Sequence, residues 1–216
     1  MKKYAVILLD DYWHPAHTIE PLLSKMFDEK EWNLRVTRDP NYIGALFMAP
    51  DLIVNFKDGI ANTSIPTPNW YTNDTWESWT TDALIRGGGA GYIGVHCGLA
   101  NIPADNPVYT DILHGRFITH PPMCPVTVHI TAQHPVTEGV TDFTIQDEHY
   151  QMEGQWDQTH VLAMTQSQHG EQVGVWAHEC GNARVVGITP GHTTEVLTCD
   201  GMLRLLRNAV NWAARK

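Results

Sequence analysis

Short apolar runs bounded by polar or turn-forming residues recur along the first hundred residues of the chain. Tyr4–Leu9, Trp32–Thr37 and Asp51–Phe56 have the length and the β-branched content of strands. After the first run, apolar residues at helical spacing predict a helix that buries one face. These residues are Ile19, Leu22, Leu23, Met26 and Phe27. The alternation of strands and helices predicts a parallel sheet with right-handed crossovers.

The segments between these strands are less regular. Asn41–Met48 is predicted to be a short helix or turn, and Ala61–Trp70 a surface loop because it is rich in Pro, Asn and Thr. Thr75–Arg86 is predicted to be a helix, since Trp76, Trp79, Ala83 and Leu84 fall on one stripe and glycines follow it.

The second half of the chain is predicted to contain more strands and a closing helix. Asn101–Pro125 is rich in proline and is expected to be irregular, apart from a helical piece at Tyr109–Leu113. The closing helix is Met202–Ala214. The β-like runs between them are Val126–Ile130, Phe143–Ile145, Val161–Thr165, Val173–Ala177 and Arg184–Thr189.

The stretch Gly87–Leu99, GGGAGYIGVHCGL, organises this pattern. It is a short buried strand that stops abruptly at His96 and Cys97. Gly94 and Gly98 lack the Cβ that would clash in a strained strand-to-helix elbow. Because ligands in open α/β sheets bind at the carboxyl ends of strands, His96 and Cys97 are expected to face a crevice.

Composition narrows the class of protein. A chain of 216 residues supports one domain, residues 1–216, with a sizeable core. The net charge of −10 disfavours nucleic acid or an anionic membrane surface as a partner and suits a small polar substrate. The tryptophans and an open sheet edge would allow a homo-oligomer.

The sequence shows no clear targeting segment and no cysteine spacing typical of disulfides or zinc sites. The first apolar run is too short for a signal peptide and ends in Asp10 and Asp11, and no segment has the roughly 18 apolar residues that span a bilayer. The four cysteines lie far apart, which argues against a disulfide framework or a thiolate zinc site. A cytoplasmic location is therefore expected.

The chain carries twelve histidines, and several follow predicted strands. His14 and His17 follow the first strand, His96 the elbow strand and His192 the strand at 184–189, so they are expected to meet at one crevice. An acidic cluster, Asp147–Tyr150, follows another β-like run.

These residues predict a His/carboxylate site that acts on a small polar substrate. The expected catalytic residues are His96, Glu148 and His192; the expected substrate-binding residues are Trp13, Asp147, Tyr150 and Cys97; the expected ligands of a divalent metal (zinc, manganese or iron) are His14, His17 and His149. Without a metal, His96 or His192 would act as the base while Glu148 steadies developing charge.

A structural interpretation stands beside each of these roles. His14 and His17 could cap the following helix, His96 could be a turn residue bonded to backbone, and Asp147 and Glu148 could form an exposed turn. Cys97 is favoured as a small buried side chain over a nucleophile. His120 and His134 precede proline, which favours fixed extended turns and a structural role. Trp13, Trp70 and Trp76 could lie in the core or stack on a sugar.

In several motifs the sequence resembles the ThuA-like (trehalose utilisation) family of the class I glutamine amidotransferase-like superfamily. The motifs are the glycine-rich run into GVHCG, LHGRFITHP (113–121), AQHPVTEGV (132–140), QDEHY (146–150), VVGITPGHT (185–193) and the terminal NWAARK. The resemblance implies a flavodoxin-like three-layer α/β sandwich with a mainly parallel central sheet, and a role in carbohydrate metabolism.

The chain departs from true amidotransferases at the elbow. Their motif is G-x-C-x-G, whereas Gly94–Gly98 places His96 at the apex and Cys97 one position later. A glutamine amidotransferase reaction is therefore disfavoured. With the carbohydrate role that the resemblance implies, the favoured function is an isomerase, lyase or hydrolase of a glycoside or keto-sugar. A non-catalytic sugar-binding or accessory module is the alternative, and a residual amidase that uses Cys97 is a third possibility.

Overall fold

A computed structural model describes residues 2–39, 50–59, 85 and 87–215 of the chain. The predicted turn at 41–48, the predicted loop at 61–70 and nearly all of the predicted helix at 75–86 lie outside the described residues. Trp70 and Trp76 lie outside them too. No helix among the described segments is long and apolar enough to cross a membrane.

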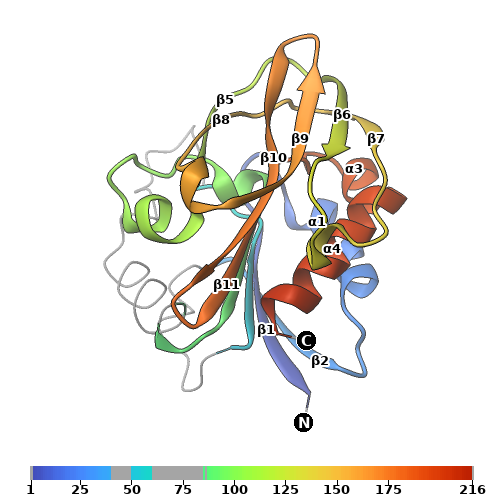
Figure 1. Ribbon diagram of the computed structural model, residues 1–216. Helices are drawn as coiled ribbons and strands as arrows, with labels where there is room; N and C mark the ends of the chain where they lie inside the picture. Colours follow the sequence, from blue (N-terminus) through green and yellow to red (C-terminus); the bar gives the residue numbers. More distant parts are fainter. Residues whose placement is uncertain (1, 40–49, 60–84, 86, 216) are drawn as a thin grey trace.

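The described strands form one large sheet and one small one (Figure 1). The large sheet has nine strands, of which the first five in spatial order are parallel and the last four antiparallel. In that order they are β2 (Trp32–Thr37), β1 (Lys3–Leu8), β3 (Leu52–Asn55), β4 (Gly91–Val95), β11 (Ala183–Ile188), β10 (Gly170–Cys180), β9 (His160–Ser167), β6 (Cys124–Ile130) and β7 (Phe143–Asp147).

The prediction of an α/β fold with a parallel central sheet is confirmed. The sheet also continues beyond its parallel strands into an antiparallel part. All the predicted β-like runs are strands, and β9 and β10 extend beyond the runs that predicted them because they form a long antiparallel hairpin. The second sheet, β5 (Gly115–Thr119) and β8 (Gln151–Gly154), was not predicted. It lies partly in the proline-rich segment, and each of its strands is too short to show a clear period.

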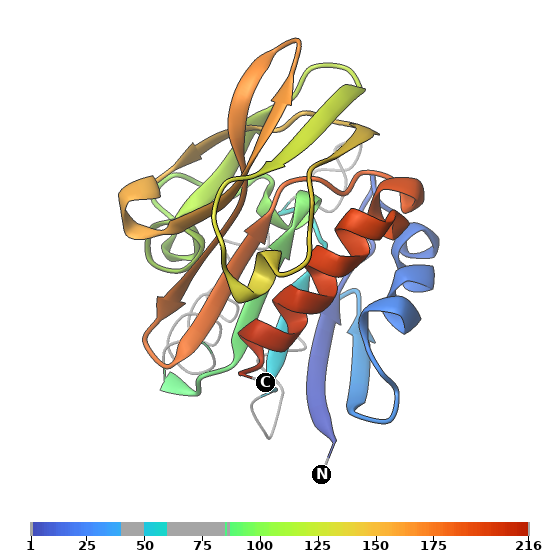
Figure 2. The same ribbon diagram turned by 45° about the vertical axis from the view of Figure 1, so that its right-hand side comes forward.

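The large sheet is covered on both faces, by helices on one and by a helical turn on the other. The helices α1 (Ala16–Met26), α3 (Thr194–Thr198) and α4 (Asp200–Ala213) cover one face (Figure 2). The buried positions of α4 recur every three or four residues, as the apolar pattern predicts. A wide helical turn at Val108–Leu113 packs its apolar side chains on the opposite face. Two separate apolar clusters therefore make a three-layer sandwich.

The elbow after β4 is a tightly constrained turn. β4 is paired on both sides, with β3 and β11, and all its residues are buried. The chain then turns at His96, whose φ of 47° is left-handed and unusual for a residue with a side chain. A Cβ on Gly98 would collide with the carbonyl oxygen of Asn55. The glycine therefore lets the elbow press against the end of β3, as the sequence predicted.

A buried histidine in β10 makes the stability of this fold depend on pH. His178 is 5% exposed, and its Nε2 lies 2.6 Å from the carbonyl oxygen of Ile112. Burial, together with the charge of His114, lowers the pKa of His178 from 6.5 to about 4. The unfolded chain binds this proton near pH 6.5 and the folded chain only near pH 4. The stability contributed by the neutral ring is therefore complete above pH 6.5 and is lost as the pH falls towards 4.

At pH 4.5 the expected loss from His178 alone is about 2–3 kcal/mol. Urea unfolding at pH 7.5 and 4.5 should show that His178→Gln loses less stability on acidification than the wild type. The exposed His169 provides the control, because His169→Gln should leave the pH dependence unchanged. Equal acid sensitivity of wild type and His178→Gln would contradict the prediction.

Candidate functional site

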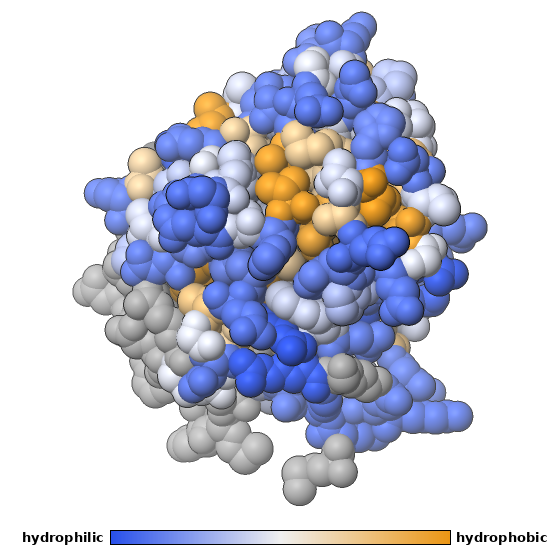
Figure 3. All heavy atoms as spheres, in the orientation of Figure 1, coloured by the Kyte–Doolittle hydropathy of each residue, from blue (hydrophilic) through white to orange (hydrophobic). Residues whose placement is uncertain are grey.

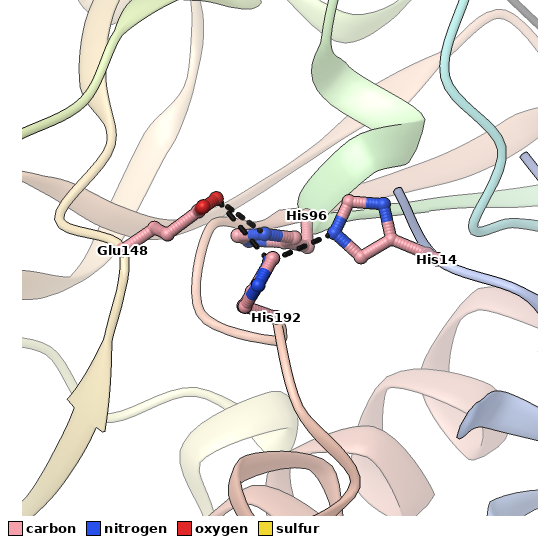
Figure 4. A group of neighbouring side chains, drawn as sticks. All are labelled: His14, His96, Glu148 and His192. Atoms are coloured by element: carbon pink, nitrogen blue, oxygen red, sulfur yellow. Dashed lines mark hydrogen bonds and ion pairs between the residues drawn. The ribbon is translucent and has the colours of Figure 1, made fainter. Parts of the chain in front are cut away.

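Four side chains from four different elements meet at the carboxyl ends of the parallel strands. His14 follows β1, His96 follows β4 and His192 follows β11, while Glu148 enters from the end of the antiparallel strand β7. Figure 4 shows Glu148 and His14 on opposite sides, with the rings of His96 and His192 between them. The sequence predicted that these loops converge, and the fold brings these four residues together.

The spacing of the four side chains is that of a metal site. His14 Nε2 lies 3.0 Å from His192 Nδ1, and Glu148 Oε2 lies 3.3 Å from His192 Nδ1 and 3.4 Å from His96 Nε2. All four potential ligand atoms lie within 4.8 Å of one another. Around a tetrahedral ion with bonds of about 2.0–2.1 Å, neighbouring ligand atoms are about 3.3 Å apart. The cluster could therefore close around one ion with small movements.

A buried carboxylate orients His14. Oδ1 of Asp11 lies 3.1 Å from His14 Nδ1 and also accepts the backbone N–H groups of Trp13 and His14. Burial opposes the charged form of Asp11, but the hydrogen bond and charge of His14 outweigh it and lower the pKa of Asp11. The ionised Asp11 thus holds the proton of His14 on Nδ1, which leaves a lone pair on Nε2, the nitrogen that lies 3.0 Å from His192 Nδ1 and could bind an ion. No sequence motif indicated this role, although Asp11 lies only three residues before His14.

A backbone carbonyl orients His96 in the same way. Nδ1 of His96 lies 2.8 Å from the carbonyl oxygen of Thr189, so it is the donor in that bond. Nε2 is buried and has no hydrogen-bond partner among the described residues, its nearest charged neighbour being Glu148 at 3.4 Å. Burial opposes the protonated ring, yet Glu148 and the charge of Asp147 outweigh it and raise the pKa of His96. A buried nitrogen without a hydrogen-bond partner is a candidate for binding a cation.

Asp147 anchors the two loops that carry Glu148 and His192. Its carboxylate is 1% exposed and accepts the backbone N–H groups of Gly191 (2.8 Å), His192 (3.1 Å) and Glu148 (3.0 Å). Because these bonds occupy both oxygens inside the protein, the expectation that Asp147 binds substrate is corrected to a role in holding the site together.

The fold does not assemble the predicted metal set of His14, His17 and His149. His17 is exposed on α1. His149 is buried, but its ring nitrogens lie next to Ser167 Oγ (2.7 Å) and to the carbonyl and hydroxyl oxygens of Thr165. It therefore faces β9 and not the cluster, since successive residues after a strand point to different sides. Only His14 of that set is close to the other candidate ligands.

The remaining predicted residues line or support the cluster. Tyr150 stacks on the His96 ring with centroids 4.1 Å apart. Cys97 is buried, its Sγ contacts the carbonyl oxygen of Phe56, and burial raises the pKa of its thiol well above the usual value. That environment disfavours a nucleophilic thiolate. Trp13 is 53% exposed beside His14, where its ring meets the edge of Tyr12.

His120 is close to the site although the sequence favoured a structural role for it. Its Nε2 lies 3.6 Å from Glu148 Oε1. Its Nδ1 lies 2.9 Å from the carbonyl oxygen of Pro121, so its Nε2 is the nitrogen that faces the carboxylate. The other His-Pro residue, His134, accepts the backbone N–H of Val136 and caps a short turn.

Comparison with known proteins agrees with this architecture. A family model described as ThuA, trehalose utilisation, matches residues 7–213. No curated protein matches the chain at a significant level.

Solved structures share the fold at low sequence identity. A ThuA-like protein from Bacteroides uniformis ATCC 8492 has 20% identity and a TM-score of 0.74, covering 98% of this chain and 91% of that one. One from Parabacteroides merdae ATCC 43184 has 16% identity and a TM-score of 0.73, covering 99% and 90%. A glutamine amidotransferase from Thermotoga maritima has 10% identity and a TM-score of 0.62 over the full length of both chains. The chain therefore has the glutamine amidotransferase-like fold and belongs to the ThuA, trehalose utilisation, family.

Proposed function

We propose that the protein is a metal-dependent enzyme of carbohydrate catabolism that acts on a glycoside or a keto-sugar. His14, His96 and His192 would hold one divalent ion, and Glu148 would move the proton. The observation that carries this proposal is the buried Nε2 of His96, which lacks a hydrogen-bond partner among the described residues and faces the other three candidate groups. A buried polar atom left unpaired costs about 1–3 kcal/mol unless something binds it.

The donor set supports a catalytic ion over a structural one. Three imidazoles with a nearby carboxylate suit zinc, manganese or iron, and three protein ligands leave a position open for substrate or water. His14 and His96 each have the second ring nitrogen held by a carboxylate or a carbonyl oxygen, which fixes the ring and its tautomer. Such supporting contacts are typical of metal-binding histidines.

The residues around the ion would have distinct tasks. A bound divalent ion would polarise a carbonyl or hydroxyl oxygen of the sugar. Burial opposes the charged form of Glu148, but the neighbouring His96 ring at 3.4 Å, together with His192 and His120, outweighs it and lowers the pKa of Glu148, which favours the ionised carboxylate. Its Oε2 points into the cluster and would accept a proton from the polarised group. The exposed face of Trp13 would stack on the C–H face of the sugar ring.

The carbohydrate substrate is inferred from the family description together with the exposed aromatic rings of Tyr12 and Trp13, which directly precede His14 in the sequence. The same rings favour the second candidate function, a sugar-binding module without catalysis. The amidase that uses Cys97 is disfavoured, because the thiol is buried against a carbonyl oxygen and its pKa is raised.

Removal of the metal tests the proposal. The purified protein is expected to carry about one equivalent of zinc, manganese or iron by mass spectrometry of its metals. Turnover of a panel of disaccharides and keto-glycosides should disappear after chelation and return when that metal is restored, because the ion supplies the polarisation. Turnover that survives complete removal of metal would refute the metal-dependent mechanism. Sugar binding by calorimetry with no turnover in any metal form would favour the binding module.

A further inference from the structure

His120 lies on the outer side of Glu148, opposite the three imidazoles. Oε2 of Glu148 faces His96 and His192, whereas Oε1 faces Nε2 of His120 at 3.6 Å. The Glu148 side chain is 14% exposed and that of His120 is 35% exposed. The two side chains thus form a line from the buried cluster to solvent.

The His120 ring is held so that Nε2 faces the carboxylate. Its Nδ1 lies 2.9 Å from the carbonyl oxygen of Pro121, and only an N–H group can bond favourably to that oxygen. In the neutral ring the proton therefore sits on Nδ1, and Nε2 presents a lone pair to Glu148. Tyr150 and Phe117 lie against the ring, with centroids at 6.0 and 5.8 Å. The ring can accept and release a proton at Nε2 without changing its other contact.

We propose that His120 relays protons between Glu148 and solvent during turnover, an inference that rests on the proposed function. When Glu148 has accepted a proton from substrate at its inner oxygen, rotation of the carboxyl group about Cγ–Cδ carries the protonated oxygen to the outer position, where the O–H bond breaks and an N–H bond forms at Nε2 of His120. The imidazolium then passes a proton to water or to a buffer base, and the neutral ring is restored. Glu148 is thereby returned to its ionised form for the next cycle.

A relay is needed because Glu148 has little contact with solvent. Its inner oxygen is enclosed by two imidazoles, so a proton leaves more readily through the outer oxygen. Histidine suits this position because its charge changes closest to neutral pH among the side chains. Since His120 acts through Glu148 and touches no reacting atom, it is a positioning and relay residue and not a catalytic one.

The test measures metal content and kcat of His120→Ala in dilute buffer, on the sugar of the panel that the wild type turns over fastest. We expect the metal content to stay at the wild-type level and kcat to fall by about 100-fold, the lower end of what positioned acid–base groups contribute. Added 4-methylimidazole should restore kcat at least tenfold, because it delivers an imidazole to the space left by the side chain. Wild type and the exposed-histidine control His169→Ala should gain nothing from it.

Each other outcome overturns the relay. An unchanged kcat in dilute buffer shows that protons leave Glu148 by another route. A low kcat that 4-methylimidazole does not restore shows that the ring only holds Glu148 in place. A wild-type protein with metal but no turnover, or with turnover but no metal, shows instead that the proposed function has failed, and the relay fails with it.

Discussion

Replacing His96 by alanine is expected to abolish stoichiometric metal binding and turnover together. The other two imidazoles and Glu148 would remain, but an ion would lose the one ligand that is completely buried and that has no other partner among the described residues. Loss of a supporting residue beyond the ligands already costs 10–100-fold in metal affinity, so loss of a ligand should cost at least about 100-fold. Metal content after dialysis, and affinity from competition with a chromophoric chelator, would measure the effect.

His149→Ala is the matched control for this experiment. His149 is as buried as His96, so its removal perturbs packing to a similar degree, yet its ring faces Ser167 and Thr165. This variant should retain one equivalent of metal. Comparing the two variants also tests two ligand sets against each other. The set predicted from the sequence includes His149, and the set that the structure assembles includes His96. If His149→Ala lost its metal while His96→Ala kept it, the assignment of the site would be refuted.

Replacing Asp147 by asparagine should weaken both the fold and the metal site. The amide has one acceptor oxygen where the carboxylate has two, so at least one of the three buried backbone N–H groups, that of Gly191, loses its acceptor and faces a buried NH₂ group that lacks a partner as well. Each unsatisfied buried donor costs about 1–3 kcal/mol, which suggests a total loss of about 2–4 kcal/mol. For a chain of this length that corresponds to a melting temperature lower by roughly 5–15 °C.

The metal affinity of Asp147→Asn should fall by about 10–100-fold, because the loops that carry Glu148 and His192 are no longer tied together. Asp142→Asn is the control, since Asp142 accepts one backbone N–H, from Ile130, at an exposed position. Its melting temperature and metal affinity should stay close to those of the wild type. Thermal unfolding of both variants measures the melting temperature, and chelator competition measures the metal affinity. A stable, metal-loaded Asp147→Asn would show that the bonds of Asp147 are dispensable.

The pattern of apolar residues predicted the central part of the fold, because the strands and turns there follow from the residue types of neighbouring positions in the sequence. Runs such as Asp51–Phe56 predicted buried strands, and the glycines around β4 predicted an elbow. Strands β5 and β8 escaped prediction, since a two-stranded ribbon of short strands has no period strong enough to stand out. Only long-range pairing makes them strands.

The sequence by itself determined that His14, His96 and His192 follow strands, and parallel strands bring such residues to one edge of a sheet whatever the loops do. Only the tertiary structure decided which nitrogen of each ring faces the centre, that Asp147 and Asp11 turn inward as anchors, and that His149 turns away while His120 turns towards Glu148. The physical reason is that the direction of a side chain after a strand depends on its turn and on the partners that distant segments supply. Asp147, for example, meets Gly191 across 44 residues of sequence.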